Sequence, residues 1–459
     1  MKIHVTNSWC KVDLEGRPVP QELLKVLSYV DKQQSFQSYR WTGRYDPVIK
    51  CLYNKRNNTF PTGLLPLVVA IQNESFELEI IDERVHPGIA WQPIPPEIAT
   101  YGEGHQEVAL NAMRDNCRGT IEGITAMGKT FVEAGFATMF PGNVLILSHR
   151  REIFDNIVRR CSEHCPSSDI GIISAGKAHP ARVTCAMVGT LSSRVKSLGS
   201  YLKQVDAILI DEAHHCSIKS QYFPIVQSCT SAFYRFGLTA TPWREGGDTI
   251  SVFAGTGPII YSYDYHQAVS EGVVVPLEVF LTSIATNLKL PILHDFHDVY
   301  ELGVVKNDER NAKIVKIAKH LHAKGENVLI LVWRLDHGKR ISKMLYGTPH
   351  EFVHGSSANR ASAKEDFESG ELPILVASAI YDEGVNIERI QNVIIAAGYK
   401  SERLLVQRTG RGMRPFEGKE KCRIFDFMDT SHAMLEKHSR ARLKYYKKQK
   451  FVVRTLEVY

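Results

Sequence analysis

The feature that most constrains this chain is a short apolar segment that ends in two adjacent carboxylates. Residues 205–210 read Val-Asp-Ala-Ile-Leu-Ile, and Asp211 and Glu212 follow directly. An apolar run of this length predicts a strand that is buried on both faces, as in a parallel sheet. In open α/β sheets, ligands bind beyond the carboxyl ends of the strands. The two carboxylates are therefore expected at a ligand site, where one can hold Mg²⁺ while the other orients or deprotonates a water molecule.

A phosphate-binding pattern lies upstream of this strand. Its spacing is G-x-x-x-x-G-K-S/T, and its members are Gly123, Ile124, Thr125, Ala126, Met127, Gly128, Lys129 and Thr130. The glycines let backbone N–H groups surround phosphate oxygens, Lys129 is expected to reach the β- and γ-phosphates, and Thr130 to sit on Mg²⁺. Residues 131–139 predict a helix whose N-terminus faces the phosphates. Short Gly-Lys-Thr strings also occur in surface loops, but the Asp-Glu strand end downstream makes ATP binding the preferred interpretation.

Composition bounds the class of protein. At 459 residues the chain is too long to fold around one hydrophobic core, and about three domains are expected. A hydrophobic content of 44% is ordinary for soluble proteins, and the net charge of +6 is compatible with a nucleic-acid partner. No apolar segment follows Met1, so no signal peptide is expected, nor any contact with a membrane. Nine scattered cysteines favour a reduced, cytoplasmic setting, which is the host cytoplasm if the chain is phage-encoded.

The order of predicted elements divides the chain into four parts. Residues 1–95 form a small α+β unit that ends in a proline-rich linker. Residues 96–250 and 251–435 each alternate buried strands with helices. This alternation predicts two tandem α/β domains, each with a parallel sheet and helices on both faces. Residues 436–459 form a basic C-terminal segment.

Two further motifs gain meaning beside a phosphate loop. Thr239 and Thr241 belong to a Thr-Ala-Thr turn after the Asp-Glu strand, where their hydroxyls could relay the state of an ATP site. Such a turn alone is an ordinary strand end. In the second α/β domain, Arg411 and Arg414 stand three residues apart, so a helix would project both from one face. Alone they form a solvated surface, but opposite a phosphate loop on another domain they are a pair of arginine fingers.

With these residues in order, the chain resembles a superfamily 2 helicase of the DEAH-box kind over residues 100–429. The motifs are Gly-Ile-Thr-Ala-Met-Gly-Lys-Thr, Asp-Glu-Ala-His, Thr-Ala-Thr and Gln-Arg-Thr-Gly-Arg-Gly-Met-Arg. The resemblance implies two tandem RecA-like domains preceded by the small α+β domain, with ATP in the cleft between the two. It also implies that Thr130 and Asp211 hold Mg²⁺, and that Glu212 is the general base for the attacking water.

The resemblance assigns further residues to the ATP site. Gln407 would help to place the water, and Arg411 and Arg414 would reach the phosphates from the second domain. Gln106 matches the glutamine that recognises adenine, and Gly384 belongs to a motif that touches both nucleotide and strand.

Coupling and nucleic-acid contacts are likewise implied by the resemblance. The residues that would couple the two sites are His214, Thr239 and Thr241. The expected nucleic-acid contacts are His149, Arg150, Gly176, Thr190, Arg334, His354 and Ser378. The chain departs from the family pattern at Ala126 and Met127, where relatives carry Gly-Ser, and at Asn386, where they often carry Asp. His105 replaces the common aromatic residue before the glutamine.

Within this superfamily, the chain is most similar to phage branch-migration helicases of the UvsW type, and more loosely to RecG-like, XPB-like and type III restriction translocases. Residues 257–261 and 271–276 resemble the bridge between their motor domains, and residues 57–65 resemble their N-terminal DNA-binding module. The resemblance implies an ATP-dependent DNA helicase or translocase that unwinds or branch-migrates forked and junction DNA in recombination, repair or replication. Branched DNA is thus the expected partner, with ATP and Mg²⁺ as cofactors, and no protein partner is indicated.

Other interpretations stay open. An RNA helicase can use the same motor motifs, and a translocase can move along duplex DNA without separating the strands. A clamp that binds ATP without hydrolysing it would need a damaged Glu212 or missing arginines, and all are present. The basic residues 437–450, with Tyr445 and Tyr446, could line a DNA path or form a solvated terminal helix. Tyr53, beside Lys50, is a weaker candidate of the same kind.

Overall fold

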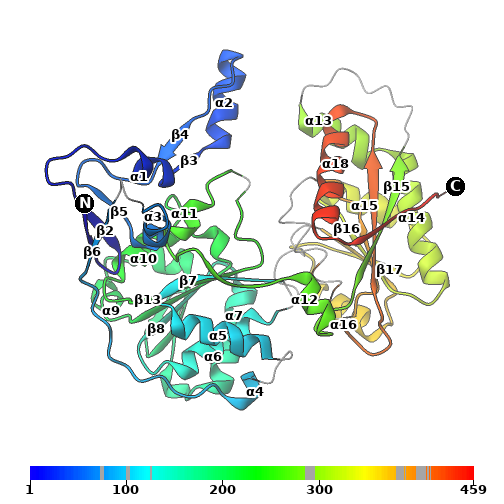
Figure 1. Ribbon diagram of the computed structural model, residues 1–459. Helices are drawn as coiled ribbons and strands as arrows, with labels where there is room; N and C mark the ends of the chain where they lie inside the picture. The colour runs from blue at the N-terminus through cyan, green and yellow to red at the C-terminus, as the bar shows by residue number, and fades with distance from the viewer. Residues whose placement is uncertain are drawn as a thin grey trace. The chain divides into compact units, whose positions relative to one another are not determined.

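Figure 1 shows a computed structural model of the chain. The structure describes residues 1–72, 77–99, 104–124, 127–244, 246–284, 295–378, 387, 389–399, 410, 413 and 415–458. The chain divides into two compact units, Met1–Asp264 and Tyr265–Tyr459. The finer division at residues 95, 250 and 435 stays a prediction.

The first unit contains an eight-stranded sheet in the order β10-β9-β11-β8-β12-β13-β7-β14. Its strands are β7 (Arg118–Gly123), β8 (Val144–Ser148), β9 (Ile170–Ser174), β10 (Lys177–His179), β11 (Val183–Met187), β12 (Ala207–Asp211), β13 (Tyr234–Thr239) and β14 (Ile259–Tyr263). All neighbouring strands are parallel except β9 and β10. Every residue of β8 and β12 is buried, which confirms the predicted doubly buried strands.

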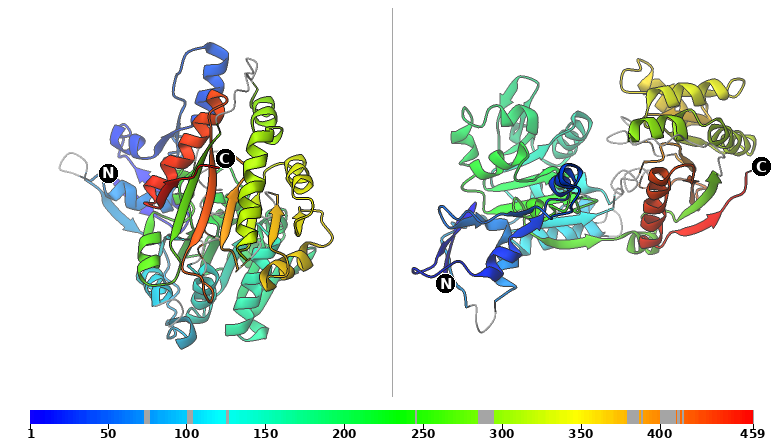
Figure 2. Two further views of the ribbon diagram at one scale, coloured as in Figure 1. Left: turned by 90° about the vertical axis from the view of Figure 1, so that its right-hand side faces the viewer. Right: turned by 90° about the horizontal axis from the view of Figure 1, so that it is seen from above.

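Helices cover both faces of this sheet (Figure 2). They are α4 (Pro96–Ala99), α5 (His105–Asp115), α6 (Lys129–Met139), α7 (Arg151–His164), α8 (Val188–Ser192), α9 (Gly199–Leu202), α10 (Tyr222–Ser228) and α11 (Ile250–Phe253). Leu145 and Leu147 of β8 pack in one apolar cluster with Leu191 of α8. Phe136 of α6 lies against Phe236 of β13, with ring centroids 5.6 Å apart. Because alternate side chains of a strand point to opposite faces, both faces are apolar and both need helices.

A four-stranded mixed sheet, in the order β5-β2-β1-β6, forms the N-terminal part of the first unit. Its elements are β1 (Lys2–Val5), β2 (Trp9–Asp13), α1 (Gln21–Val26), β5 (Thr59–Pro61), α3 (Leu65–Val69) and β6 (Glu79–Asp82). Its apolar core forms around Ile3 and Phe60. Ile250, Phe253 and Ala254, which lie in the chain between β13 and β14 of the eight-stranded sheet, pack in this core. The two sheets of this unit therefore share a seam of apolar packing rather than meeting through a linker alone.

A hairpin leaves this N-terminal part and carries a helix at its end (Figure 1). Its strands are β3 (Ser28–Val30) and β4 (Ile49–Cys51), which pair antiparallel. Between them lies α2 (Lys32–Thr42), which begins after Asp31 and ends at Gly43 in the left-handed conformation. The Asp31 carboxylate accepts a hydrogen bond from the Gln34 backbone N–H, which is the usual way in which a helix start is capped.

The second unit is built on a seven-stranded sheet in the order β17-β18-β16-β19-β20-β15-β21. Its strands are β15 (Leu277–Ile284), β16 (Val328–Leu331), β17 (His350–Val353), β18 (Ile374–Ala377), β19 (Asn392–Ile395), β20 (Cys422–Asp429) and β21 (Val452–Thr455). All pairs are parallel, as predicted for a second α/β domain. The helices are α12 (Tyr265–Ser270), α13 (Phe296–Tyr300), α14 (Asp308–Ala323), α15 (Leu335–Met344), α16 (Arg360–Ser369) and α18 (Ala433–Lys448), and a π-helix spans Glu301–Val305. Among the described helices of both units, none has the length and apolarity needed to cross a bilayer.

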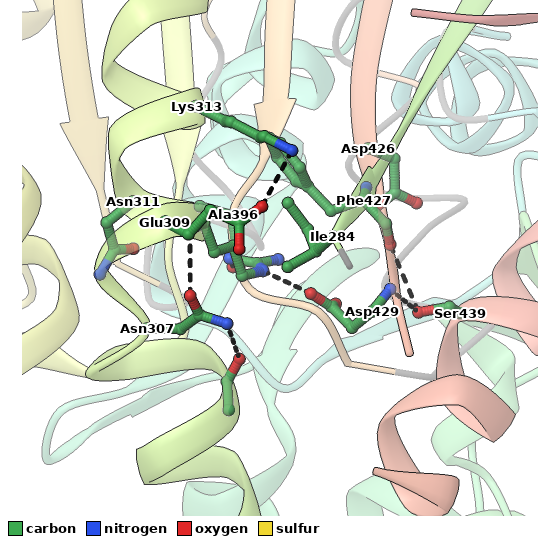
Figure 3. A network of polar contacts seen from close by, with 12 residues as sticks. Ile284, Asn307, Glu309, Asn311, Lys313, Ala396, Asp426, Phe427, Asp429 and Ser439 are labelled. Atoms are coloured by element: carbon green, nitrogen blue, oxygen red, sulfur yellow. Dashed lines mark hydrogen bonds and ion pairs between the residues drawn. The ribbon is translucent and has the colours of Figure 1, made fainter. Parts of the chain in front are cut away.

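A buried polar network ties the helices of the second unit to the end of β20 (Figure 3). The fully buried Arg310 of α14 donates to Asp429 Oδ1 at 2.8 Å and to the Ala396 carbonyl at 2.8 Å. The Asp429 backbone N–H donates to Ser439 Oγ of α18 at 3.1 Å. Burial raises the pKa of the Asp429 carboxyl, and the charge of Arg310 acts against that rise. A buried carboxylate needs such a partner, because an unpaired charge in the interior is costly.

The C-terminal helix α18 packs on this network. Arg442 donates to Asp426 Oδ2 at 2.8 Å and to the Phe427 carbonyl at 2.7 Å. Tyr446 is fully buried and donates to the same Asp426 oxygen at 2.8 Å, and Tyr445 is also buried. The prediction that these two rings line a DNA path is therefore wrong, because both belong to the core of the unit. Tyr53 is buried as well.

The ion pair of Arg442 gives a test of this packing. We expect Arg442→Ala to lower the free energy of unfolding by about 3–5 kcal/mol, since it leaves the Asp426 carboxylate buried without its charged partner. Arg440→Ala on the same helix is the matched control, because that side chain is 72% exposed beside Glu436. Its expected cost is below about 1 kcal/mol. Urea denaturation of the full chain measures both, and equal midpoints for the two variants would contradict the role of the buried pair.

Candidate nucleotide and nucleic-acid site

The loop between β7 and α6 has the shape that the phosphate pattern predicts. Gly128 adopts φ 80° and precedes Lys129, the first residue of α6, so the free N–H groups of that helix open onto the loop. A Cβ on Gly123 would lie 1.8 Å from the Met127 sulfur, so a larger residue here would have to displace the Met127 side chain. The Met127 side chain is fully buried, and its backbone N–H donates to the Ile124 carbonyl at 3.0 Å. Thr125 and Ala126 lie outside the described residues.

Two side chains of α5 form polar contacts with the backbone of this loop. Gln106 Nε2 donates to the Met127 carbonyl at 2.7 Å, and a His105 ring nitrogen lies 2.8 Å from the same oxygen. The His105 ring stacks on Tyr263 of β14, with centroids 4.2 Å apart and an angle of 13° between planes. His105 thus provides the flat ring that an aromatic residue would supply at this position. Gln106 is fully buried against the phosphate loop, and its adenine contact stays a prediction.

The two carboxylates stand at the carboxyl end of β12. Asp211 is 3% exposed, and its Oδ2 has no hydrogen-bond partner among the described residues. Burial raises the pKa of Asp211, and the neighbouring Glu212 raises it further, while Lys129 acts against both. Burial also tends to raise the pKa of Glu212, but the hydrogen bond to His214 and the charge of Lys129 outweigh it, so that pKa is lowered. Glu212 therefore keeps its negative charge at neutral pH, as a base for water must.

The backbone at Glu212 is strained. Its φ of 47° and ψ of 53° place it in the left-handed region, which residues other than glycine seldom adopt. Such a conformation costs about 1–3 kcal/mol and persists where the surrounding structure enforces it, often at functional sites. Here it turns the Glu212 side chain away from the line of β12 and beside His214.

His214 joins the ends of β12 and β13. Its Nδ1 lies 3.3 Å from Glu212 Oε2 and 2.9 Å from Thr239 Oγ1. The Thr241 backbone N–H donates to the same Thr239 oxygen at 3.1 Å. The structure therefore brings together the three residues expected to couple the sites, with His214 between Glu212 and the Thr-Ala-Thr turn.

A cavity of about 410 Å³ opens next to this group. Its lining residues are His149, Met187, Val188, Gly189, Thr190, His215, Ser220, Gln221 and Tyr222. His149 and Thr190 were both expected to contact nucleic acid. The ring of His215 lies between those of His149 and His214, with centroid distances of 4.1 Å and 4.3 Å. A row of three histidine rings thus runs from the cavity to Glu212.

Glu133 and His215 are site residues that the sequence motifs did not single out. Glu133 lies on α6 one turn after Lys129 and is fully buried, with no hydrogen-bond partner for its carboxyl oxygens among the described residues. Burial raises its pKa, and the charge of Asp211 adds to the rise. The available signals were a glutamate on an otherwise apolar helix face and a second histidine after Asp-Glu-Ala-His.

The remaining expected contacts are spread over both units. Arg150 donates to His149 Nε2 at 3.2 Å, and the Gly176 carbonyl accepts from Arg194 at 3.2 Å, both in the first unit. In the second unit, Arg334 pairs with Asp336 at 2.9 Å, His354 Nδ1 lies 3.0 Å from Ser356 Oγ, and Ser378 is buried. Besides Thr125 and Ala126, four more residues expected at the ATP site lie outside the described residues, and these are Gly384, Gln407, Arg411 and Arg414.

The residues present suit a magnesium ion. Asp211 offers a buried carboxylate oxygen that has no hydrogen-bond partner in the described part of the chain, and hard cations such as Mg²⁺ prefer such oxygens. Thr130 follows Lys129 in the first turn of α6. Both are first-unit residues that flank the phosphate loop and the end of β12.

Comparison with known proteins agrees with this geometry. The family described as "Type III restriction enzyme, res subunit" matches residues 101–244, and the "Helicase conserved C-terminal domain" matches residues 310–415. A DNA 3'-5' translocase, XPB2 of Sulfurisphaera tokodaii, is 25% identical over 350 residues, which are 68% of this chain and 78% of that protein. The ATP-dependent DNA helicase uvsW of Enterobacteria phage T4 is 24% identical over 67% of this chain and 64% of its own length.

Fold comparison gives the same architecture. A fragment of an HsdR subunit of a type I restriction enzyme from Vibrio vulnificus covers 93% of this chain and 82% of its own, with a TM-score of 0.59 at 16% identity. The chain spans about half the length of several other curated relatives that it matches, at 47%, 50% and 52%.

Glu212 gives a direct test of the site. We expect Glu212→Gln to lower the rate of ATP hydrolysis by about 10²–10⁴-fold, because the amide cannot take a proton from water. ATP should still bind, since the phosphate loop is untouched. Single-turnover hydrolysis and titration with a fluorescent ATP analogue measure the two effects. Glu107→Gln on the exposed face of α5 is the control, and hydrolysis at the parental rate in Glu212→Gln would refute the assignment of the base.

Proposed function

The chain belongs to the superfamily 2 helicases, and we propose that it moves along DNA, driven by ATP hydrolysis, to unwind or branch-migrate forks and four-way junctions. Its family makes it an ATP-hydrolysing enzyme of the DNA helicase and translocase group. One observation carries the proposal. The same edge of the eight-stranded sheet holds the phosphate loop, the Asp211-Glu212 pair and, through His214 and His215, a cavity lined by expected nucleic-acid contacts.

At the ATP site, we propose that each residue has one task. Lys129 and the N–H groups of the loop bind the phosphates. Thr130 and Asp211 hold Mg²⁺, which would neutralise charge on the phosphoryl oxygens. Glu212 orients the attacking water and accepts its proton. Phosphoryl transfer depends mainly on positioning and on stabilisation of charge. The groups proposed here are of the types that ATP hydrolysis needs.

The second motor domain would complete the site. In the proposed division, residues 96–250 and 251–435 are the two motor domains, residues 1–95 an accessory DNA-binding domain, and residues 436–459 a basic end. Arg411 and Arg414 would reach the phosphates from the second motor domain, and Gln407 would help to place the water. An arginine finger typically contributes ~10³–10⁵ in rate. Hydrolysis would therefore require closure of the two domains, and cycles of closure would move them along a strand.

The row of histidines supports a route by which bound DNA would influence ATP hydrolysis. A strand in the cavity would meet His149 and Thr190, and a displacement of the His149 ring would press on His215 and then on His214. His214 contacts both Glu212 and Thr239. A strand could thus change the position of the base without touching the nucleotide, which is the coupling that a translocase needs.

Branched DNA is favoured by the N-terminal part of the first unit. It adds a four-stranded sheet and a projecting hairpin to the unit that holds the phosphate loop. The relatives named as DNA translocase and DNA helicase point to the same substrate class. An RNA helicase and a duplex translocase without strand separation are the alternatives, since both can use the same motor.

The response of ATP hydrolysis to different nucleic acids tests the proposal. We expect a fork or a four-way junction to stimulate the ATPase of the full chain several-fold more than single-stranded DNA, at fixed salt. Phosphate contacts alone do not distinguish these substrates, so the preference would come from contacts that the N-terminal part adds. Stimulation by RNA alone would move the function to RNA unwinding. Equal stimulation by a blunt duplex and a fork, without strand displacement, would favour the duplex translocase.

The role of His215 can be tested separately. We expect His215→Ala to leave the DNA-independent ATPase within about two-fold of the parent and to reduce the stimulation by DNA by about ten-fold, a coupling of roughly 1.4 kcal/mol. His320→Ala, an exposed histidine of α14, is the control. The measured quantity is the ratio of rates with and without single-stranded DNA. An unchanged ratio in His215→Ala would exclude the ring row as the coupling route.

A further inference from the structure

The hairpin of residues 28–51, which we call the aromatic arm, exposes an unusual set of side chains. It consists of β3, α2 and β4, and its exposed apolar residues are Phe36 at 57%, Tyr39 at 45%, Trp41 at 90%, Tyr45 at 59% and Ile49 at 66%. None of these belongs to an apolar cluster among the described residues. Figures 1 and 2 show α2 at the end of the hairpin, away from both sheets of the first unit. Such a concentration of exposed rings on one projection indicates a binding surface.

The base of the aromatic arm is fixed firmly. The buried Asp31 caps α2 and forms an ion pair with Lys219 at 3.2 Å, and the Lys32 backbone N–H donates to the Gly246 carbonyl at 3.0 Å. Ser35 Oγ donates to the Asp31 carbonyl at 2.7 Å and accepts from the Val48 N–H at 2.8 Å. The hydrogen bond to Gln34 lowers the pKa of Asp31, so its charge is retained at neutral pH. These contacts fix the base of the arm to the rest of the first unit.

The base of the aromatic arm contacts a segment that also lines the cavity. Lys219 directly precedes Ser220 and Gln221, two of the cavity's lining residues. Gly247 follows the Gly246 anchor, and a Cβ there would lie 2.7 Å from the Val30 carbonyl. The arm thus rises from the same short segments that follow the Asp211-Glu212 pair and the Thr-Ala-Thr turn. The base of the arm is therefore attached next to two residues that line the cavity, Ser220 and Gln221.

The chemistry of the arm fits nucleic acid better than a protein groove. Lys32, at the base of the arm, and Arg44, near its tip, are exposed and form no ion pair with any described residue. A helix that docks in a protein groove presents apolar residues at i, i+3, i+4 and i+7, whereas α2 has only Phe36 and Tyr39 at such spacing. Exposed rings mixed with unpaired cations are instead the combination that binds single strands, because every base offers a face for stacking and every phosphate a charge.

We propose that the aromatic arm binds unpaired bases of DNA at a junction, with Trp41 as the stacking platform and Phe36, Tyr39 and Tyr45 beside it. Lys32 and Arg44 contact the phosphates of the same strand. The arm holds the strand that leaves the duplex while the cavity holds the strand that the motor follows. This inference rests on the proposed DNA substrate, and it adds a binding site and a preference for unpaired DNA to it.

Binding of a fork and of a blunt duplex of the same sequence tests this proposal. Fluorescence anisotropy of labelled DNA is measured with the full chain, without nucleotide and at fixed salt. We expect Trp41→Ala to weaken binding to the fork by about 5- to 100-fold and to leave duplex binding unchanged. Trp41→Phe, which keeps a flat ring, should retain most of the fork affinity. The control is Tyr346→Ala, an equally exposed aromatic residue of the second unit at 89%, which should change neither.

Tryptophan fluorescence supplies an independent readout. The chain has five tryptophans, and Trp41 is the most exposed of them at 90%. An unlabelled oligothymidine should quench a part of the parental fluorescence that is missing in Trp41→Phe, although that variant still binds. Identical quenching in both proteins would overturn the proposal. So would equal fork affinity in Trp41→Ala and the parent, or an equal loss for fork and duplex.

The proposal for the aromatic arm and the proposed function would be contradicted by different results. If Trp41→Ala binds forks like the parent while the parental ATPase is stimulated by forks, the arm proposal falls and the proposed function stands. If no DNA stimulates the parental ATPase but Trp41→Ala still loses its affinity for forks, the proposed function falls and the arm remains a binding site for unpaired DNA.

Discussion

The structure of the first unit depends on how it stabilises two neighbouring carboxylates at the carboxyl end of β12. Asp211 is buried at the end of the central strand β12, and Glu212 follows it with a side chain that is 17% exposed. Like charges at this separation repel strongly in a medium of low dielectric constant. Two neighbours make the pair tolerable. Lys129 attracts both carboxylates, and His214 forms a hydrogen bond with Glu212.

These compensating partners explain much of the surrounding architecture. Lys129 can act only from the first turn of α6, so the phosphate loop must bring that helix start to the end of β12. His214 can act only if the chain turns sharply after β12, which the left-handed Glu212 achieves. The third residue of the Asp-Glu-Ala-His turn is the buried Ala213, and a Cβ on Gly237 of β13 would lie 2.6 Å from its side chain. The small residues of this region are thus a consequence of the tight turn that the carboxylates require.

Sequence patterns could predict the parts of this protein that are local in the chain. The apolar run before Asp211 and the spacing of Gly123, Gly128 and Lys129 each describe one strand end or one loop, and both lie where they were expected. Contacts between distant segments were not predictable in the same way. The hydrogen bond of Gln106 to Met127, the burial of Tyr446 against Asp426 and the place of His215 between two other rings depend on which elements become neighbours. A basic, tyrosine-containing C-terminal segment looks solvated in sequence, yet its rings complete the core of the second unit because Asp426 and Asp429 are buried opposite it.

The seam between the N-terminal sheet and the rest of the first unit has a consequence for the history of this chain. A Cβ on Gly63 would lie 2.1 Å from the Phe253 carbonyl, and Arg235, buried in β13, donates to Ser8 Oγ at 3.0 Å. Surfaces that fit this closely cannot be exchanged one at a time. A lineage that replaced its first hundred or so residues by recombination would expose apolar surface around Phe253 and leave Arg235 with one fewer acceptor. The N-terminal part and the motor are therefore expected to be inherited together, and to vary together, as one unit of selection.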